Sequence, residues 1–194
     1  KVAENLYNKI LEINPNHVNA NNNLGIIFQK LKQTQKAIGY FQKAIKIKPD
    51  YADAYYNLGK IFNELHEYQK AIHHYEKAIQ INYNQADVHN NLGVIFRSLG
   101  EHQKAINCYE KAIKIDPNYV NAYNNFGMIL GELNRINEAK KNFEKSLNLD
   151  PDKKETHEGY GNILLKLNHH SKALEYIREG TGFVRFTQKD FEII

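Results

Sequence analysis

The sequence has little of what marks several other classes of protein. It contains one cysteine, Cys108, so no disulfide can form within the chain, and we expect a reducing, cytoplasmic location. No apolar run approaches the roughly 20 residues that a membrane span needs, and no signal peptide is visible. The chain starts at Lys1 and its only methionine is Met128, so we interpret it as a piece of something longer.

Strong charge and catalytic motifs are also missing. The formal net charge of +4 is spread along the chain with no basic block, which argues against nucleic acid as a partner. The metalloprotease motif HExxH, the nucleophile motif GxSxG, the P-loop and the dinucleotide fingerprint do not occur. We therefore expect no enzyme activity, no cofactor and no metal site, and no membrane partner.

What the sequence does contain is an internal repeat of 34 residues. Isoleucine, leucine and alanine recur two, six and twelve places after a periodic glycine, and the four prolines share one phase of the repeat. Several independent columns in register identify a repeat architecture. The periodic glycines are Gly25, Gly59, Gly93, Gly127 and Gly161.

A 34-residue helix-turn-helix period with small residues at fixed places resembles the tetratricopeptide repeat (TPR) family. The resemblance covers almost the whole chain when the glycine is placed at position 8 of the repeat. The predicted organisation is the second helix of a truncated repeat (1–17), four repeats (18–51, 52–85, 86–119 and 120–153), a degenerate fifth repeat (154–187), and a tail or linker (188–194). The tryptophan usual at position 4 is replaced by asparagine, tyrosine or histidine.

The fold class implied is an all-α, right-handed superhelical solenoid with at least ten helices and no sheet. Apolar residues recur three and four apart within each predicted helix, so one face of every helix is buried. The glycine column is read as structural, because it lies where the two helices of a repeat cross. A single hairpin cannot bury its apolar face alone, and stacking of hairpins buries it.

The resemblance also implies a binding face, because the first helices of TPR hairpins line a concave groove. Asparagine occupies positions 5 and 6 of most repeats, although it is a poor helix former. Its amide both donates and accepts hydrogen bonds, so a column of amides suits an extended peptide backbone, as in the repeats of O-linked N-acetylglucosamine transferase. Hydrogen bonds between repeats are the alternative role. The candidate peptide-binding residues are Asn22, Asn23, Asn57, Lys60, Asn90, Asn91, Arg97, Asn124 and Asn125.

Two readings of function follow from this face. The first is a scaffold that binds an extended peptide or partner segment, and its open repeat ends offer a route to self-association. The second is the substrate-recognition arm of a larger enzyme, a transferase or oxygenase, whose catalytic domain is absent. The apolar tail from Phe183 to Ile194 favours a further domain over a tail that folds back, as in bacterial TPR segments that precede a catalytic domain.

Overall fold

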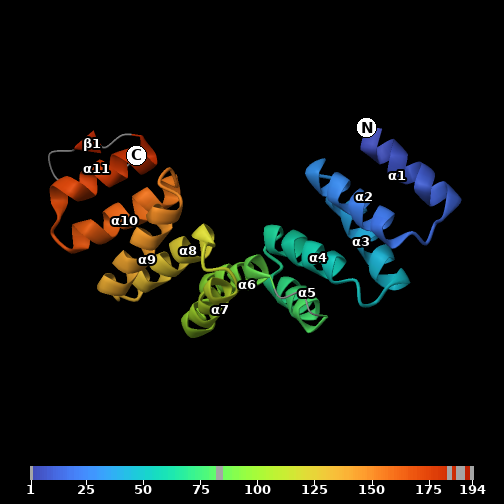
Figure 1. Cartoon of the computed structure of the whole chain (residues 1–194), viewed down its shortest axis with the longest axis horizontal. Helices are drawn as coiled ribbons and strands as arrows, with labels where there is room; N and C mark the ends of the chain where they lie inside the picture. Colours follow the sequence, from blue (N-terminus) through green and yellow to red (C-terminus); the bar gives the residue numbers. More distant parts are fainter. Residues whose placement is uncertain (1, 82–84, 183–184, 187–190, 193–194) are drawn as a thin grey trace. The chain divides into compact units, whose positions relative to one another are not determined.

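The computed structural model describes residues 2–81, 85–182, 185–186 and 191–192, and this part of the chain contains eleven α-helices. The chain divides into two compact units, residues 1–84 and 85–194, which are described separately. Figure 1 shows the helices of each unit in sequence order. No helix among the described residues is long and apolar enough to cross a membrane.

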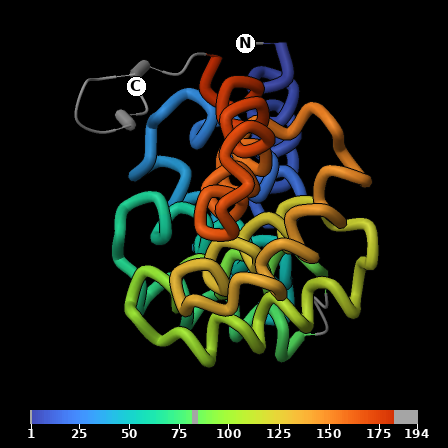
Figure 2. Tube along the Cα trace, turned by 90° about the vertical axis from the view of Figure 1, so that its left-hand side faces the viewer, coloured from blue at the N-terminus to red at the C-terminus, as the bar shows by residue number. Residues whose placement is uncertain are grey.

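Unit 1 contains a single helix followed by two helical hairpins. Its helices are α1 (Val2–Ile13), α2 (Val18–Lys30), α3 (Thr34–Ile47), α4 (Ala52–Glu64) and α5 (Tyr68–Gln80). Unit 2 contains three hairpins, in which consecutive helices pack side by side (Figure 2). Its helices are α6 (Ala86–Ser98), α7 (His102–Ile115), α8 (Val120–Glu132), α9 (Ile136–Leu149), α10 (Lys154–Lys166) and α11 (His170–Thr181). The predicted all-α helical repeat fold is confirmed.

The tail differs from the prediction of a chain without any sheet. Two strands of two residues each, β1 (Arg185–Phe186) and β2 (Phe191–Glu192), pair in antiparallel register. Gly182 ends α11 in the left-handed conformation, with φ at +88°, so the helix cannot continue into this segment. The prediction was wrong here because it extended the helical period past the point where the repeat columns fade. Phe183, Val184, Ile193 and Ile194 lie outside the described residues.

The turn inside every hairpin has the same backbone geometry. In the first hairpin the N–H of Lys32 donates to the Gln29 carbonyl, and the N–H of Gln33 donates to the Phe28 carbonyl, both at 2.9 Å. This pair of bonds is the Schellman motif, which needs one residue at positive φ. The residues at positive φ recur every 34 positions: Lys32, His66, Gly100, Asn134 and Asn168. Only one of them is glycine, so this column was not visible in the sequence.

The two helices of a hairpin are held together by a side chain of the second helix that packs on the glycine of the first. In the first hairpin, a Cβ added at Gly25 would lie only 2.5 Å from the Cε1 atom of Phe41, a ring that is fully buried. Gly59, Gly93 and Gly127 meet Tyr75, Tyr109 and Phe143 in the same way. The ring occupies the space that any side chain at the glycine would need. The structural role predicted for these glycines therefore has a direct geometric cause.

Two glycine substitutions in the first hairpin separate this packing effect from helix propensity. Gly25→Ala should destabilise the protein by about 1–3 kcal/mol, because the new methyl group overlaps the Phe41 ring. A Cβ added at Gly39, inside α3, would meet no atom within 4 Å, so Gly39→Ala should stabilise by about 0.5–1 kcal/mol. Urea unfolding of both variants measures the difference. Equal effects of the two substitutions would contradict the packing described.

The half-buried His74 of α5 makes stability depend on pH. Its ring stacks on Phe62 with centroids 5.3 Å apart, and burial, aided by the neighbouring His73, lowers the pKa of His74 to about 4. The unfolded chain binds this proton near pH 6.5, so the stabilising contribution is complete above that pH and is lost as pH falls toward 4. His74→Phe keeps the stacked ring and should flatten the melting temperature between pH 6.5 and 4. An unchanged pH profile would contradict this assignment.

Candidate functional site: the ladder face

Hydrogen bonds between asparagine side chains join the first helices of neighbouring hairpins. In unit 1 the Nδ2 of Asn57 donates to the Oδ1 of Asn22 at 3.2 Å. In unit 2 the Nδ2 of Asn125 donates to the Oδ1 of Asn90 at 2.9 Å. Each pair links residues that are 35 apart, one more than the repeat period. We call the surface that carries these bonds the ladder face, formed by α2 and α4 in unit 1 and by α6, α8 and α10 in unit 2.

A second row of contacts with the same spacing lies nearer the helix ends. In unit 1 the amide of Gln29 donates to the Glu64 carboxylate at 3.2 Å. In unit 2 the Nε of Arg97 donates to both carboxylate oxygens of Glu132, at 3.0 and 3.1 Å. The Nζ of Lys166 donates to the Gly131 carbonyl at 3.0 Å. Polar contacts therefore connect one repeat to the next in both units.

The nine predicted site residues fall into two groups. Four asparagines are buried, three of them in ladder bonds, and the other five residues are half-buried. The buried residues are Asn22, Asn57, Asn90 and Asn124, and the half-buried ones are Asn23, Lys60, Asn91, Arg97 and Asn125. Asn22, Asn57 and Asn90 therefore make contacts inside the protein, and the half-buried residues keep part of their surface exposed to solvent.

Three of the half-buried residues have contacts with other side chains. The guanidinium of Arg97 forms an ion pair with Glu132, and this hydrogen bond raises the pKa of Arg97 above its usual range. Arg97 therefore stays protonated, and the paired Glu132 carboxylate balances its positive charge. The Nδ2 of Asn23 donates to the Tyr7 hydroxyl of α1 at 3.0 Å. The Lys60 ammonium lies 5.7 Å from the centre of the Tyr56 ring.

The ladder stops at the last hairpin because a glycine replaces the next asparagine. The residue 35 positions after Asn124 is Gly159, which has no side chain to donate a hydrogen bond. Within the described residues the Oδ1 of Asn124 is buried and has no hydrogen-bond partner. Its Nδ2 lies 3.5 Å from the Oδ1 of Asn125 and 3.8 Å from the Met128 sulfur.

A pocket of about 210 Å³ opens on the ladder face where the ladder stops. We call it the ladder pocket. It lies between α8 and α10, with Phe143 of α9 against Gly127 and Gly159. Exposed polar side chains of α8 and α10 stand at its edge. The lining residues are Gly127, Met128, Gly131, Glu132, Phe143, Gly159, Asn162, Ile163 and Lys166.

A larger cavity, about 890 Å³, lies in unit 1 between α1 and α3, away from the ladder face. Asn21 lines it and donates through Nδ2 to the carbonyls of Pro15 and His17, at 3.3 and 3.0 Å. Tyr55 and Tyr123 occupy the matching position in other repeats. The side chain of Asn21 is smaller than the tyrosine found at this position in those repeats.

Cys108 and the histidines were considered as a possible second site. Burial raises the pKa of the half-buried Cys108 thiol to about 11, so the thiol is not activated. In the part of the chain that the structure describes, no three histidine, cysteine, aspartate or glutamate side chains converge as metal ligands.

The chain belongs to the tetratricopeptide repeat family. The family model described as tetratricopeptide repeat matches residues 18–83, 50–118 and 84–152. Repeats of this family form protein-interaction scaffolds. The sequence matches none of the curated proteins with which it was compared.

Solved structures of several other proteins are similar to this chain. MamA is 34% identical, with a TM-score of 0.69, and the match covers 76% of this chain and 86% of MamA. YrrB is 22% identical, with a TM-score of 0.73 and 91% of both chains covered. PilF of Pseudomonas aeruginosa is 24% identical, with a TM-score of 0.77, covering 85% of this chain and 75% of that one. The similarities to YrrB and PilF, at 22% and 24% identity, show a shared fold only.

Two asparagines at the same repeat position test the ladder. Asn90 and Asn124 are each 5% exposed, but only Asn90 accepts a bond from the next repeat. Asn90→Ala should destabilise unit 2 by about 1 kcal/mol because it leaves the Asn125 amide without its acceptor. Asn124→Ala removes an unpartnered acceptor and gains helix propensity, so its effect should lie near zero or be stabilising. Thermal unfolding measures the change in stability of the two variants. A larger loss of stability for Asn124→Ala than for Asn90→Ala would contradict the ladder described.

Proposed function

We propose that the ladder face binds an extended polypeptide segment of a partner protein. The observation that supports this proposal is that the asparagines hydrogen-bond to one another and still keep free hydrogen-bonding capacity. Each ladder bond uses one acceptor of a buried asparagine and one donor hydrogen of the next. An amide offers two donor hydrogens and an acceptor oxygen, so a half-buried residue such as Asn125 keeps capacity for a ligand while its partner Asn90 holds it in place.

An extended peptide suits this surface because its backbone presents N–H and C=O groups at regular intervals. Backbone contacts carry no side-chain information, so the amides would contribute affinity for many sequences. Arg97 would contribute little by charge because Glu132 neutralises it. Among the solved structures, YrrB is described as a TPR protein with an unusual peptide-binding site, which supports peptide binding as a use of this fold.

Calorimetry with acetylated, amidated decapeptides of several unrelated sequences tests the proposal. The Asn91→Ala/Asn125→Ala double variant should weaken the binding of all of them by about ten-fold, since each lost hydrogen bond contributes roughly 0.5–1.5 kcal/mol. The Asn107→Ala/Asn148→Ala variant is the matched control, because both asparagines are exposed on the second helices α7 and α9. Its affinities should equal those of the original chain.

A charge-driven surface would behave differently in the same experiment. It would tolerate the two alanines, weaken in a Lys60→Gln variant, and lose affinity steeply between low and high salt. That pattern, or unchanged affinity in the Asn91→Ala/Asn125→Ala variant, would contradict the proposal. Circular dichroism and melting temperature establish that each variant is folded.

A further inference from the structure

The ladder pocket has two properties that a flat stretch of the ladder face does not have. It is a hollow on the helix surface, and its interior is apolar, with the Phe143 ring and the Ile163 side chain both at most 3% exposed. Its volume of about 210 Å³ exceeds the roughly 150 Å³ of an engineered cavity that binds benzene. One leucine-sized side chain therefore fits in it.

Two glycines lie beside the pocket, each in close contact with one of its apolar side chains. Gly131 and Gly159 lie on α8 and α10, and a Cβ added at Gly131 would lie 2.9 Å from the Cδ1 of Ile163. The same Gly159 leaves the buried Oδ1 of Asn124 without the donor that an asparagine there would supply, while the Nδ2 of Asn124 lies 3.8 Å from the sulfur of Met128, which lines the pocket. Protein interiors rarely leave such a group unsatisfied, so the pocket lies where the ladder leaves one buried amide without its usual partner.

The rim of the pocket offers hydrogen-bond donors and one positive charge. Asn162 and Lys166 are exposed and lie four residues apart on the same side of α10. Among the described residues Lys166 has no ion pair, and its Nζ contacts only the Gly131 carbonyl. The acidic residue of the rim, Glu132, is already paired with Arg97. The unneutralised charge at this rim is therefore positive.

We propose that the ladder pocket is a specificity site for an acidic peptide segment, in which an aliphatic side chain enters the pocket and a neighbouring aspartate or glutamate side chain meets Lys166. This inference rests on the proposed function and names the class of its ligand. An internal acidic side chain needs one cation, which Lys166 supplies. A C-terminal carboxylate is disfavoured because the nearby Arg97, the second cation it would use, is held by Glu132.

Met128 provides a direct readout of the pocket. It lines the pocket and is the only methionine of the sequence, so methyl labelling with ¹³C gives one signal from this site. A Met128→Leu variant assigns the signal against any start methionine. The full chain is titrated with a capped hexapeptide that contains leucine followed by aspartate between glycine and serine residues.

Three altered peptides isolate the two parts of the ligand. Replacing the leucine of the peptide by serine should weaken binding about ten-fold, because the buried apolar side chain is lost. Aspartate replaced by asparagine should weaken it about three-fold, as expected for an exposed ion pair. A peptide that ends in leucine with a free carboxylate should bind no better than the asparagine peptide. Tighter binding of that last peptide would overturn the choice of an internal acid.

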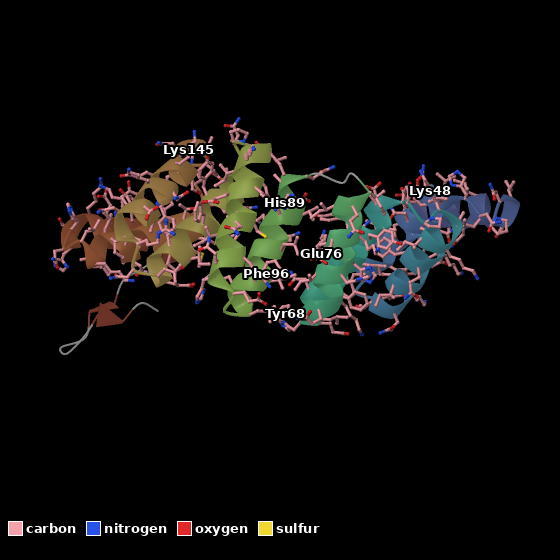
Figure 3. The ribbon with its side chains drawn as sticks, turned by 90° about the horizontal axis from the view of Figure 1, so that it is seen from below. Lys48, Tyr68, Glu76, His89, Phe96 and Lys145 are labelled. Atoms are coloured by element: carbon pink, nitrogen blue, oxygen red, sulfur yellow. The ribbon has the colours of Figure 1, made fainter. Side chains whose placement is uncertain are left out.

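Protein variants test the same contacts from the other side. Lys166→Gln should remove the preference for aspartate over asparagine, while Lys145→Gln, a change at an exposed lysine of α9 that Figure 3 labels, should retain it. Gly131→Leu should remove the preference for leucine over serine by filling the pocket. Lys166 is exposed, so its variant stays informative even if Gly131→Leu unfolds.

The outcomes separate this inference from the proposed function. The pocket assignment would be overturned if peptides bind by calorimetry without a shift of the Met128 methyl signal, or if the leucine and serine peptides bind equally well. Peptide binding to the ladder face would then remain intact. No binding of any peptide, including the unrelated decapeptides, would overturn both. A shift of the methyl signal that follows the leucine and aspartate preferences supports both.

Discussion

The structure depends on the contact between a glycine of each first helix and a large side chain of the following helix. Phe41, for example, occupies the space where a side chain at Gly25 would lie, so the two helices approach closely. Because the hairpin closes in this way, the first helices lie next to the first helices of neighbouring repeats. The ladder bonds between residues 35 apart are the consequence. The ladder face is therefore a consequence of how the core packs.

The asparagines of a ladder bond in unit 2 differ in how deeply they are buried. Asn90 is buried and accepts from Asn125, which is half-buried and keeps hydrogen-bond capacity at the surface. A buried amide costs stability unless it is paired, and pairing it with the next repeat removes that cost and fixes the orientation of its neighbour. At Gly159 the pairing ends, and the row of amides gives way to an apolar pocket with a lysine at its rim.

The repeat columns predicted the helices and the glycine contacts, because one side chain at each of these positions fits the packed hairpin. The left-handed turn residues were missed since Lys32, His66 and Asn134 share a backbone conformation without sharing a side-chain type. The sequence allows the asparagines either to bind a peptide or to form hydrogen bonds between repeats. It does not show which side chains are buried, so it could not assign Asn57 to the ladder. The pocket was missed because a hollow between α8 and α10 is set by side-chain packing, and Gly131, where Ile163 approaches α8, belongs to no column of the repeat.

Paramagnetic broadening by a spin-labelled peptide tests most directly whether the ladder face is where a partner segment binds. A nitroxide at one end of a bound decapeptide broadens amide signals near it, so the broadened residues map the binding surface. Unit 2 offers both surfaces, with His89 and Phe96 near the two ends of the first helix α6 and Lys145 on the second helix α9 (Figure 3). The account predicts broadening around Asn91 and Asn125 on α6 and α8 and sharp signals around Lys145. Broadening confined to α7 and α9 would contradict it.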